Sequence, residues 1–253
     1  RVPCTAIVIT LNEAAHIEAC LASVAWADER LVVDSGSTDD TVAIATRCGA
    51  RVITQPWPGY SAQKNFAASQ AAHDWIVSVD ADERVTPELA AEMKAALAAP
   101  GDHAGFRVPR VTFHLGRWIR GTDWYPDYQL RLYDRRRASW NGRKVHESVA
   151  ANGPVGQLRH DLQHFAYRDI AHHLDTINRY TTLAAEHMHA EGRRTGYAEL
   201  LLHPPAAFLR NYLLRGGIRL GTAGLIISVM NSYYVFLKFA KLAALQDAPA
   251  SAP

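Results

Sequence analysis

One apolar run that ends in three carboxylates constrains this chain more than any other stretch. It reads Trp-Ile-Val-Ser-Val-Asp from Trp75 to Asp80, and Asp82 and Glu83 follow almost at once. Runs rich in β-branched residues are typical of buried parallel strands, so the acids begin where the strand ends. Because open α/β sheets bind ligands beyond the carboxyl ends of their strands, we predict a ligand site at this edge.

The two aspartates of this run favour a metal site. If the chain stays extended past Val79, Asp80 and Asp82 point to the same side. Two such carboxylates repel each other unless a hard divalent cation lies between them and a phosphate. The alternative is a polar turn before a helix that is capped by Thr86 and has Pro87 in its first turn. That turn accounts for Thr86 and Pro87 but not for the two aspartates.

The first hundred residues alternate between strand and helix patterns. Strands are expected over residues 4–10, 30–33, 51–54 and 75–80, and helices over 13–24 with Asn12 as cap, over 40–48, over a short segment capped by Ser61, and from Pro87 to about Pro100. This alternation is typical of a parallel sheet with crossover helices, an α/β fold. After Gly105, short strands at 106–111 and 130–133 predict antiparallel additions to the sheet.

Polar residues recur where these strands end. Glu13 follows the first strand, where it is either a first-turn acid favoured by the helix dipole, the better reading from this residue alone, or a ligand for a substrate hydroxyl. The acidic loop 34–41 suits hydrogen bonds to a base or ribose, and a capped turn explains it equally well. Lys64 reaches the same edge, where a lysine meets a diphosphate or simply lies at the surface.

Four motifs occur in order along this part of the chain. They are Thr10-Leu11-Asn12-Glu13, the segment Val33 to Thr41, Gln63-Lys64-Asn65-Phe66-Ala67 and Asp80-Ala81-Asp82-Glu83. In order and spacing they resemble the family 2 glycosyltransferases. The resemblance implies an α/β fold of the GT-A (Rossmann-like) type, a mixed sheet flanked by helices, together with a nucleotide-sugar donor and a divalent cation, Mg²⁺ or Mn²⁺.

The resemblance also assigns roles to residues of this chain. It implies that Asp82, with Asp80, holds the metal. The nucleotide-sugar site that it implies comprises Leu11, Glu13, Asp34, Ser35, Asp39, Lys64, Asp80 and Asp82. His164 corresponds to a late metal or phosphate ligand in several similar enzymes.

The second part of the chain is expected to hold the acceptor. Trp124 and Tyr125 suit stacking on sugar faces, although aromatic residues in a core explain them equally well. Arg131 begins a basic run, continued by residues 135–137, that faces an anionic acceptor or forms a solvated hairpin.

Inverting sugar transfer needs a carboxylate base to take the proton from the acceptor hydroxyl. Glu147 is the first choice, since it matches a His-Glu pair at this place in similar enzymes. Asp127 is the substitute. An ion pair between Glu147 and Arg143 or Lys144 is the structural alternative.

The C-terminal part of the chain is expected to be helical, over 170–191 and, after Pro204 and Pro205, to about Leu245. Aliphatic and aromatic residues alternate there with Arg210, Arg215, Arg219, Lys238 and Lys241. This composition favours helices that lie in the interface of an anionic inner leaflet. A helical pair packed on the catalytic domain, or on a second copy in a homo-oligomer, is the alternative. We expect a GT-A catalytic domain at 1–165, with a nucleotide-sugar half (1–100) and an acceptor half (101–165), and a helical extension at 166–253.

Together with Trp124-Tyr125-Pro126-Asp127 and Arg131-Leu132-Tyr133, this tail sharpens the resemblance toward bacterial lipopolysaccharide inner-core β-1,4-glucosyltransferases. It implies transfer of glucose from UDP-glucose to a heptose of a lipid-anchored core oligosaccharide. A formal charge of +2 argues against a nucleic-acid partner, and the cysteines Cys4, Cys20 and Cys48, which lack metal-ligand spacing, favour reduced thiols in the cytoplasm. A polyprenyl-phosphate sugar transferase and a non-catalytic nucleotide-sugar-binding protein are the alternatives.

Overall fold

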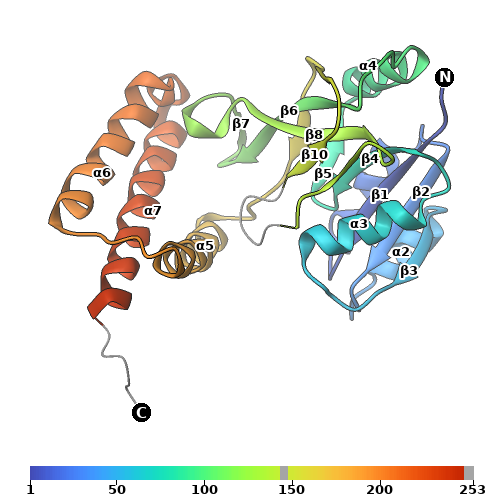
Figure 1. Cartoon of the computed structure of the whole chain (residues 1–253). Coiled ribbons are helices and arrows are strands. Elements are labelled where there is room, and N and C mark those ends of the chain that lie inside the picture. The colour runs from blue at the N-terminus through green and yellow to red at the C-terminus, as the bar shows by residue number, and fades with distance from the viewer. Residues whose placement is uncertain (143–147, 248–253) are drawn as a thin grey trace. The chain divides into compact units, whose positions relative to one another are not determined.

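The computed structural model describes residues 1–142 and 148–247. Its internal contacts divide the chain into two units (Figure 1). Unit 1 comprises Arg1–Val111 and Asp127–Phe165, and unit 2 comprises Thr112–Pro126 and Ala166–Pro253. Residues 112–126, expected in the acceptor half of the catalytic domain, thus group with the C-terminal helices.

Unit 1 is built on a mixed sheet. Its parallel part has the order β3 (Arg51–Thr54), β2 (Glu29–Asp34), β1 (Cys4–Thr10) and β4 (Trp75–Asp80). Asp34 is in register with Thr10, and Asp80 with Ile9. The carboxyl ends of β1, β2 and β4 therefore meet at one edge, as the sequence predicted.

The remaining strands continue this sheet. They are β8 (Asp127–Asp134), β6 (Gly105–His114), β12 (Leu162–His164) and β5 (Glu83–Val85), in that order after β4, with β11 (Val155–Gln157) beside β6. β8 runs antiparallel to both β4 and β6, which confirms the predicted antiparallel additions. A separate hairpin pairs β9 (Ala138–Trp140) with β10 (Val149–Ala151). The predicted α/β mixed sheet flanked by helices is confirmed.

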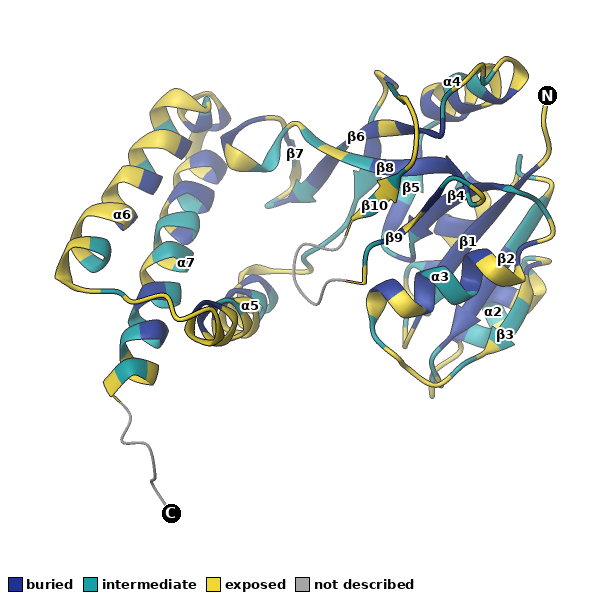
Figure 2. Ribbon diagram, in the orientation of Figure 1, coloured by how far each residue is buried: buried dark blue, intermediate teal, exposed yellow. Residues whose placement is uncertain are grey.

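Helices cover both faces of the sheet because successive strand residues point to opposite sides. On one face Val8 and Val77 pack with residues of α1 (Ile17–Ser23) and α4 (Pro87–Ala98). On the other, Ile7 and Ile76 pack with α3 (Tyr60–Gln70). Figure 2 shows β1, β2 and β4 buried between these layers. α2 (Thr41–Arg47) connects β2 to β3.

Some predicted boundaries are wrong for identifiable reasons. Asn12 does not cap the first helix: its φ is +56°, and α1 begins only at Ile17. Ser61 is not a cap either, because α3 begins at Tyr60 after Gly59 and runs for 11 residues. The chain also does not stay extended past Asp80, since Ala81 and Asp82 form a turn. The cap at Thr86 is confirmed by a 3.2 Å hydrogen bond from Leu89 N to its Oγ1.

Unit 2 is mainly helical. Its elements are β7 (Arg117–Ile119), which forms a hairpin with the end of β6, η1 (Thr122–Trp124), α5 (Ile170–Ala190), α6 (Tyr197–Leu209), the π-helical turn η2 (Arg210–Leu214), η3 (Gly217–Leu220) and α7 (Gly221–Asp247). Pro204 and Pro205 lie inside α6, whereas the sequence suggested that a helix starts after them.

A buried asparagine ties unit 2 together. Asn211 Oδ1 accepts hydrogen bonds from Asp123 N and Asn231 Nδ2, both at 2.8 Å, and its Nδ2 donates to Ala207 O at 2.9 Å. By length and composition alone, residues 217–247 are apolar enough to cross a membrane, with a third of their most apolar window buried. A core helix of a soluble protein passes the same test, so this is weak evidence.

Candidate active site

The loops that follow β1 and β2 are joined by hydrogen bonds. Asn12 N donates to Ser37 Oγ and Thr38 N donates to Asn12 Oδ1, both at 2.8 Å, and Glu13 N donates to Thr41 Oγ1 at 2.8 Å. These bonds explain the left-handed backbone at Asn12, whose side chain satisfies a donor of the neighbouring loop instead of its own helix. Glu13 is thereby fixed at the carboxyl edge of the sheet.

Two of the predicted nucleoside-binding acids shape this loop pair. Asp34 accepts hydrogen bonds from Gly36 N and Ser37 N, both at 2.9 Å, and from Thr10 Oγ1 at 3.0 Å. Burial would raise the pKa of Asp34, but the hydrogen bonds from Ser37, Gly36 and Thr10 lower it. Asp39, which is exposed, likewise accepts from Ala14 N at 3.1 Å and Thr41 N at 3.0 Å.

The loop pair still leaves groups for a ligand. Leu11 is 51% exposed at its rim. Ser35 lies under α3, where Gln63 Nε2 donates to its Oγ at 3.1 Å. Contacts of Leu11, Ser35, Asp34 and Asp39 with a nucleoside stay predictions. Asp34 and Asp39 accept main-chain hydrogen bonds of the loops whatever they bind.

Asp80 lies between two cations. Lys64 Nζ is 2.7 Å from Asp80 Oδ1, and Arg131 Nη2 is 2.8 Å from Oδ2. Burial would raise the pKa of Asp80, but the charges of Arg131 and Lys64 hold it well below its ordinary value. Both oxygens of Asp80 are therefore engaged by protein cations, which makes it a weaker metal ligand than the sequence suggested.

This arrangement changes the role expected of Arg131. Only 2% of the residue is exposed, and its guanidinium bonds to Asp80 and to Glu83 Oε1 at 2.6 Å. Such burial leaves no surface for an acceptor. We assign Arg131 to positioning Asp80, in place of the acceptor contact expected from the sequence.

The same ion-pair chain reaches Asp127. Glu83, which is fully buried, also pairs through Oε1 with Arg110 Nη1 at 3.1 Å, and its Oε2 accepts from Asp80 N at 3.0 Å. Arg110 donates to Asp127 Oδ2 from Nη2 at 2.7 Å and from Nε at 2.9 Å, while Gln129 donates to Oδ1 at 2.7 Å. With both oxygens occupied, Asp127 is a poor base in this geometry.

Asp82 has different surroundings. Its Oδ2 lies 3.3 Å from His164 Nε2, and its side chain is 29% exposed. β12 delivers His164 to this point, because His164 is in register with Glu83 of β5. Burial would raise the pKa of Asp82, but the hydrogen bond and charge of His164 lower it.

The side chains of Asp82 and His164 suit a divalent cation that takes only a few of its ligands from the protein. Carboxylate oxygen is the preferred ligand of Mg²⁺ and Mn²⁺, and imidazole adds a neutral donor. Within residues 1–142 and 148–247, no group of three or more His, Cys, Asp and Glu side chains has a metal-holding arrangement. Asp82 and His164 would therefore hold a cation together with oxygens of a ligand.

Burial and the nearby acids raise the pKa of Glu13. Burial, followed by the charges of Asp82, Asp39 and Asp80, raises its pKa from 4.5 to about 7. The folded protein thus retains a proton on Glu13 at pH values where the unfolded chain has lost it. The free energy of unfolding falls as the pH rises through this window.

Glu13→Gln is therefore expected to raise the urea midpoint of the metal-free protein at pH 8, and to raise it less at pH 5. The glutamine removes an ionisation that the folded state disfavours. Glu18→Gln, at an exposed acid in the first turn of α1, is the matched control and should give the same small change at both pH values. An equal effect of Glu13→Gln at pH 5 and pH 8 would contradict the raised pKa.

Three further predicted site residues belong to unit 2 or lie outside the described residues. Glu147 lies outside the described residues, so its role as base stays a prediction. Trp124 belongs to unit 2, where its ring packs 5.5 Å from that of Tyr167 and its Nε1 donates to Asn231 Oδ1 at 3.2 Å. This supports the core reading for Trp124. Tyr125 lies beneath Arg120, with its ring centroid 5.4 Å from the guanidinium carbon.

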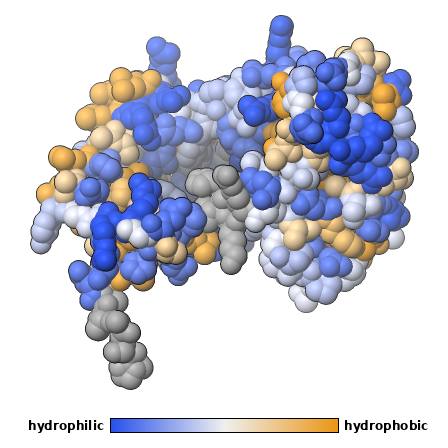
Figure 3. Space-filling view, in the orientation of Figure 1, coloured by the Kyte–Doolittle hydropathy of each residue, from blue (hydrophilic) through white to orange (hydrophobic). Residues whose placement is uncertain are grey.

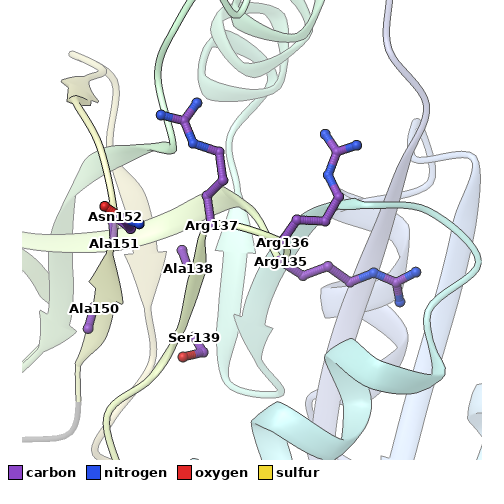
Figure 4. Close-up of a pocket in the computed structure, with 8 residues that line it drawn as sticks. All are labelled: Arg135, Arg136, Arg137, Ala138, Ser139, Ala150, Ala151 and Asn152. Atoms are coloured by element: carbon purple, nitrogen blue, oxygen red, sulfur yellow. The ribbon is translucent and has the colours of Figure 1, made fainter.

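The basic run after Arg131 lines an open pocket of about 410 Å³ (Figure 4). Its arginines already have partners. Arg135 donates to Ala68 O at 2.7 Å, Arg136 pairs with Asp134 at 2.6 Å, and Arg137 pairs with Asp102 at 3.5 Å. The geometry favours a neutralised, solvated hairpin over an acceptor surface.

Two members of the ion-pair chain were not predicted as site residues. In the sequence, Glu83 is only the third acid of its run. Its burial depends on the turn that Ala81 and Asp82 form. Arg110 had no signal in the sequence, because a single arginine within a strand usually faces solvent. Its role follows only from the pairing of β6 with β8, which aligns Arg110 with Asp127.

Comparison with known proteins gives consistent matches. A protein-family model described as glycosyl transferase family 2 matches residues 5–154. The lipopolysaccharide core biosynthesis glycosyltransferase LpsC of Rhizobium meliloti is 33% identical over 249 residues, which cover 96% of this chain and 92% of the relative. An uncharacterized glycosyltransferase of Rickettsia felis is 31% identical over 252 residues, covering 94% of this chain and 88% of the relative.

Solved structures give a weaker match. Glucosyl-3-phosphoglycerate synthase from Mycobacterium tuberculosis, crystallised with Mn²⁺, UDP and glucosyl-3-phosphoglycerate, is 26% identical, with a TM-score of 0.38. The match covers 46% of this chain and 45% of that one, and no functional inference rests on it.

Proposed function

Since the chain belongs to glycosyltransferase family 2, we propose that it transfers glucose from UDP-glucose to a heptose of a lipopolysaccharide inner core, with inversion at the anomeric carbon. The acceptor class is supported by LpsC, whose name places it in lipopolysaccharide core biosynthesis and which this chain matches over 96% of its length. A lipid-anchored core oligosaccharide as the acceptor is part of the same proposal.

The proposed mechanism rests on one observation of the site. Asp82 and His164 form a partly exposed pair close to Asp80, which is itself ion-paired with Lys64 and Arg131. Asp80 is thus neutralised by Lys64 and Arg131, while Asp82 remains available to a ligand. Mg²⁺ or Mn²⁺ held by Asp82 and His164 would offset the charge that develops on the departing diphosphate.

The protein's own groups complete the proposal. Lys64, beside Asp80 and 4.3 Å above the Trp140 ring, provides a fixed positive charge next to the diphosphate position. Glu13 and the loop 34–41 would orient the nucleoside. Glu147 takes the proton from the acceptor hydroxyl as that oxygen attacks the anomeric carbon. The preference for Glu147 over Asp127 rests on the occupied oxygens of Asp127.

Release of UDP tests this function. With Mg²⁺ or Mn²⁺, UDP release from UDP-glucose should increase when a heptose-containing core lipid is added, and Glu147→Gln should remove most of that increase. Release with a different UDP-sugar would replace the donor and keep the reaction. UDP binding without release from any donor would contradict a transferase, and near-normal turnover of Glu147→Gln would contradict deprotonation by Glu147.

A location on the cytoplasmic face of the inner membrane, by peripheral association, belongs to the same proposal. It is supported by the apolar C-terminal helix, and it would place the enzyme beside the proposed lipid-anchored acceptor. A homo-oligomer formed through the C-terminal helices is the alternative use of those surfaces. The small net charge of +2 gives no support to a nucleic-acid partner.

A further inference from the structure

The turn that connects α6 to α7 exposes large aliphatic side chains. Leu214 is 82% exposed, and Leu213 and Ile218 are 52% and 53% exposed. Figure 3 shows hydrophobic side chains gathered over the α6 part of unit 2. Single exposed apolar residues need no explanation, but a cluster of this kind marks an interaction surface.

Arginines border this turn on two sides. Arg215 and Arg219 are exposed within the turn itself. The neighbouring hairpin contributes Arg117, whose Nη1 donates to Leu220 O at 2.8 Å, and the exposed Arg120. We call residues 115–123 and 210–220 together the Leu214 tip.

The two segments of the Leu214 tip form one surface. Thr122 N donates to Arg215 O at 2.7 Å, and a Cβ on Gly121 would meet Arg215 O at 3.1 Å. The backbones are thus in direct contact. Main-chain packing therefore fixes the position of the backbone that carries the arginines and the exposed leucines.

The charge of the Leu214 tip is strongly one-sided. Its two segments contain five arginines and one acid, Asp123. Asp123 pairs with Arg210 and, at 3.7 Å, with Arg215. Beyond the tip, the sequence has no acid between Glu199 and Asp247. Arg117 and Arg219 therefore add positive charge around the apolar cluster.

We propose that the Leu214 tip docks on the surface of an anionic phospholipid bilayer. Leu213, Leu214 and Ile218 enter the boundary between headgroups and acyl chains, and the arginines contact lipid phosphates. Basic residues that flank exposed aliphatic side chains are the chemistry that such a surface attracts.

The positive charge of the Leu214 tip also argues against a second copy of the chain as the partner that covers it. A symmetric dimer through the Leu214 tip would bring two sets of arginines together, and like charges across an interface disfavour association. An anionic bilayer removes that repulsion. α7 adds a further exposed apolar stripe at helical spacing, formed by Leu225, Val229, Tyr233 and Phe236.

This inference specifies the residues behind the membrane association included in the proposed function. It is tested without any sugar transfer, so its failure is distinguishable from failure of the enzymatic proposal. The full chain is mixed with vesicles of phosphatidylcholine, alone or with about one third phosphatidylglycerol, and bound protein is measured by flotation. Binding is expected with the anionic vesicles and should weaken as salt screens the arginines.

Two variants separate the apolar and the basic parts. Leu214→Ser combined with Ile218→Ser should weaken binding by about tenfold or more, because two exposed aliphatic groups no longer enter the bilayer. Arg219→Gln should weaken it by about fivefold, which corresponds to one arginine near an anionic surface.

Matched controls are available in the same chain. Leu183→Ser removes a leucine of α5 that is 44% exposed, and Arg47→Gln removes an exposed arginine at the end of α2. Both should retain vesicle binding, and thermal melting of every variant should match the wild type. Equal binding to both vesicle types, or unchanged binding of the Leu214 and Arg219 variants, would overturn the proposal. A dimer that Leu214→Ser dissociates, in protein that ignores vesicles, would also overturn it.

Discussion

Asp82→Ala is expected to lower acceptor-stimulated UDP release by about 100-fold or more. Asp82 is partly exposed and pairs with an imidazole, its Oδ2 lying 3.3 Å from His164 Nε2, whereas Asp80 pairs with a lysine and an arginine. Metal ions provide several kcal/mol of stabilisation to departing charge, and about 3 kcal/mol corresponds to a 100-fold change in rate. The substitution should also weaken Mn²⁺ binding measured by calorimetry, a readout that does not depend on turnover.

Asp102→Asn is the matched control for this experiment. The Asp102 side chain is 87% exposed and makes a 3.5 Å ion pair with Arg137, well outside the group around Asp82. The control should stay within twofold of the wild type in activity. If Asp82→Ala retained full activity and full Mn²⁺ affinity while folded, the assignment of Asp82 as the metal-holding residue would fail.

Glu83→Gln is expected to lower the free energy of unfolding by about 3 kcal/mol, because removal of one partner leaves buried charge without compensation. Glu83 is fully buried, and its Oε1 is the shared partner of Arg110 and Arg131. Glutamine keeps the shape of the side chain but removes the charge. Urea denaturation at neutral pH measures the loss.

Glu88→Gln provides the comparison, since Glu88 is an exposed acid in the first turn of α4. Surface changes of this kind usually stay within about 0.5 kcal/mol. Arg110→Met, measured alone and combined with Glu83→Gln, adds a further check. The changes in the free energy of unfolding should not add, because the two residues are directly paired. Equal stability of Glu83→Gln and Glu88→Gln would show that the ion-pair chain carries no net stabilisation.

Local sequence patterns were sufficient where local interactions dominate. The strands at 51–54 and 75–80 have the predicted bounds, because β-branched apolar residues there are followed by prolines or acids. Thr86 and Pro87 start α4 as expected, since a cap requires only residues one turn apart. The parallel order followed from the alternation of elements.

Predictions from local patterns were wrong where a residue distant in the sequence provided a different partner. Asn12 has the chemistry of a helix cap, yet Thr38 of another loop donates to its side chain. Arg131 looked like a surface residue of a basic run, yet β8 places it beneath Asp80, where it is buried. Asp127 looked like a free acid, yet Arg110 and Gln129 occupy its oxygens.

The sequence alone determined the α/β class and the sheet edge at which polar residues gather. These follow from side-chain periodicity and from the position of polar residues at strand ends, which short-range geometry controls. The metal role of Asp82 was implied by the family resemblance and stays a proposal. Only the tertiary structure decided which carboxylates pair with lysine or arginine and which, like Asp82, pair with an imidazole. That distinction depends on Lys64, Arg110 and Arg131, which reach Asp80, Glu83 and Asp127 from other elements, and electrostatic pairing follows distance in space and not separation along the chain.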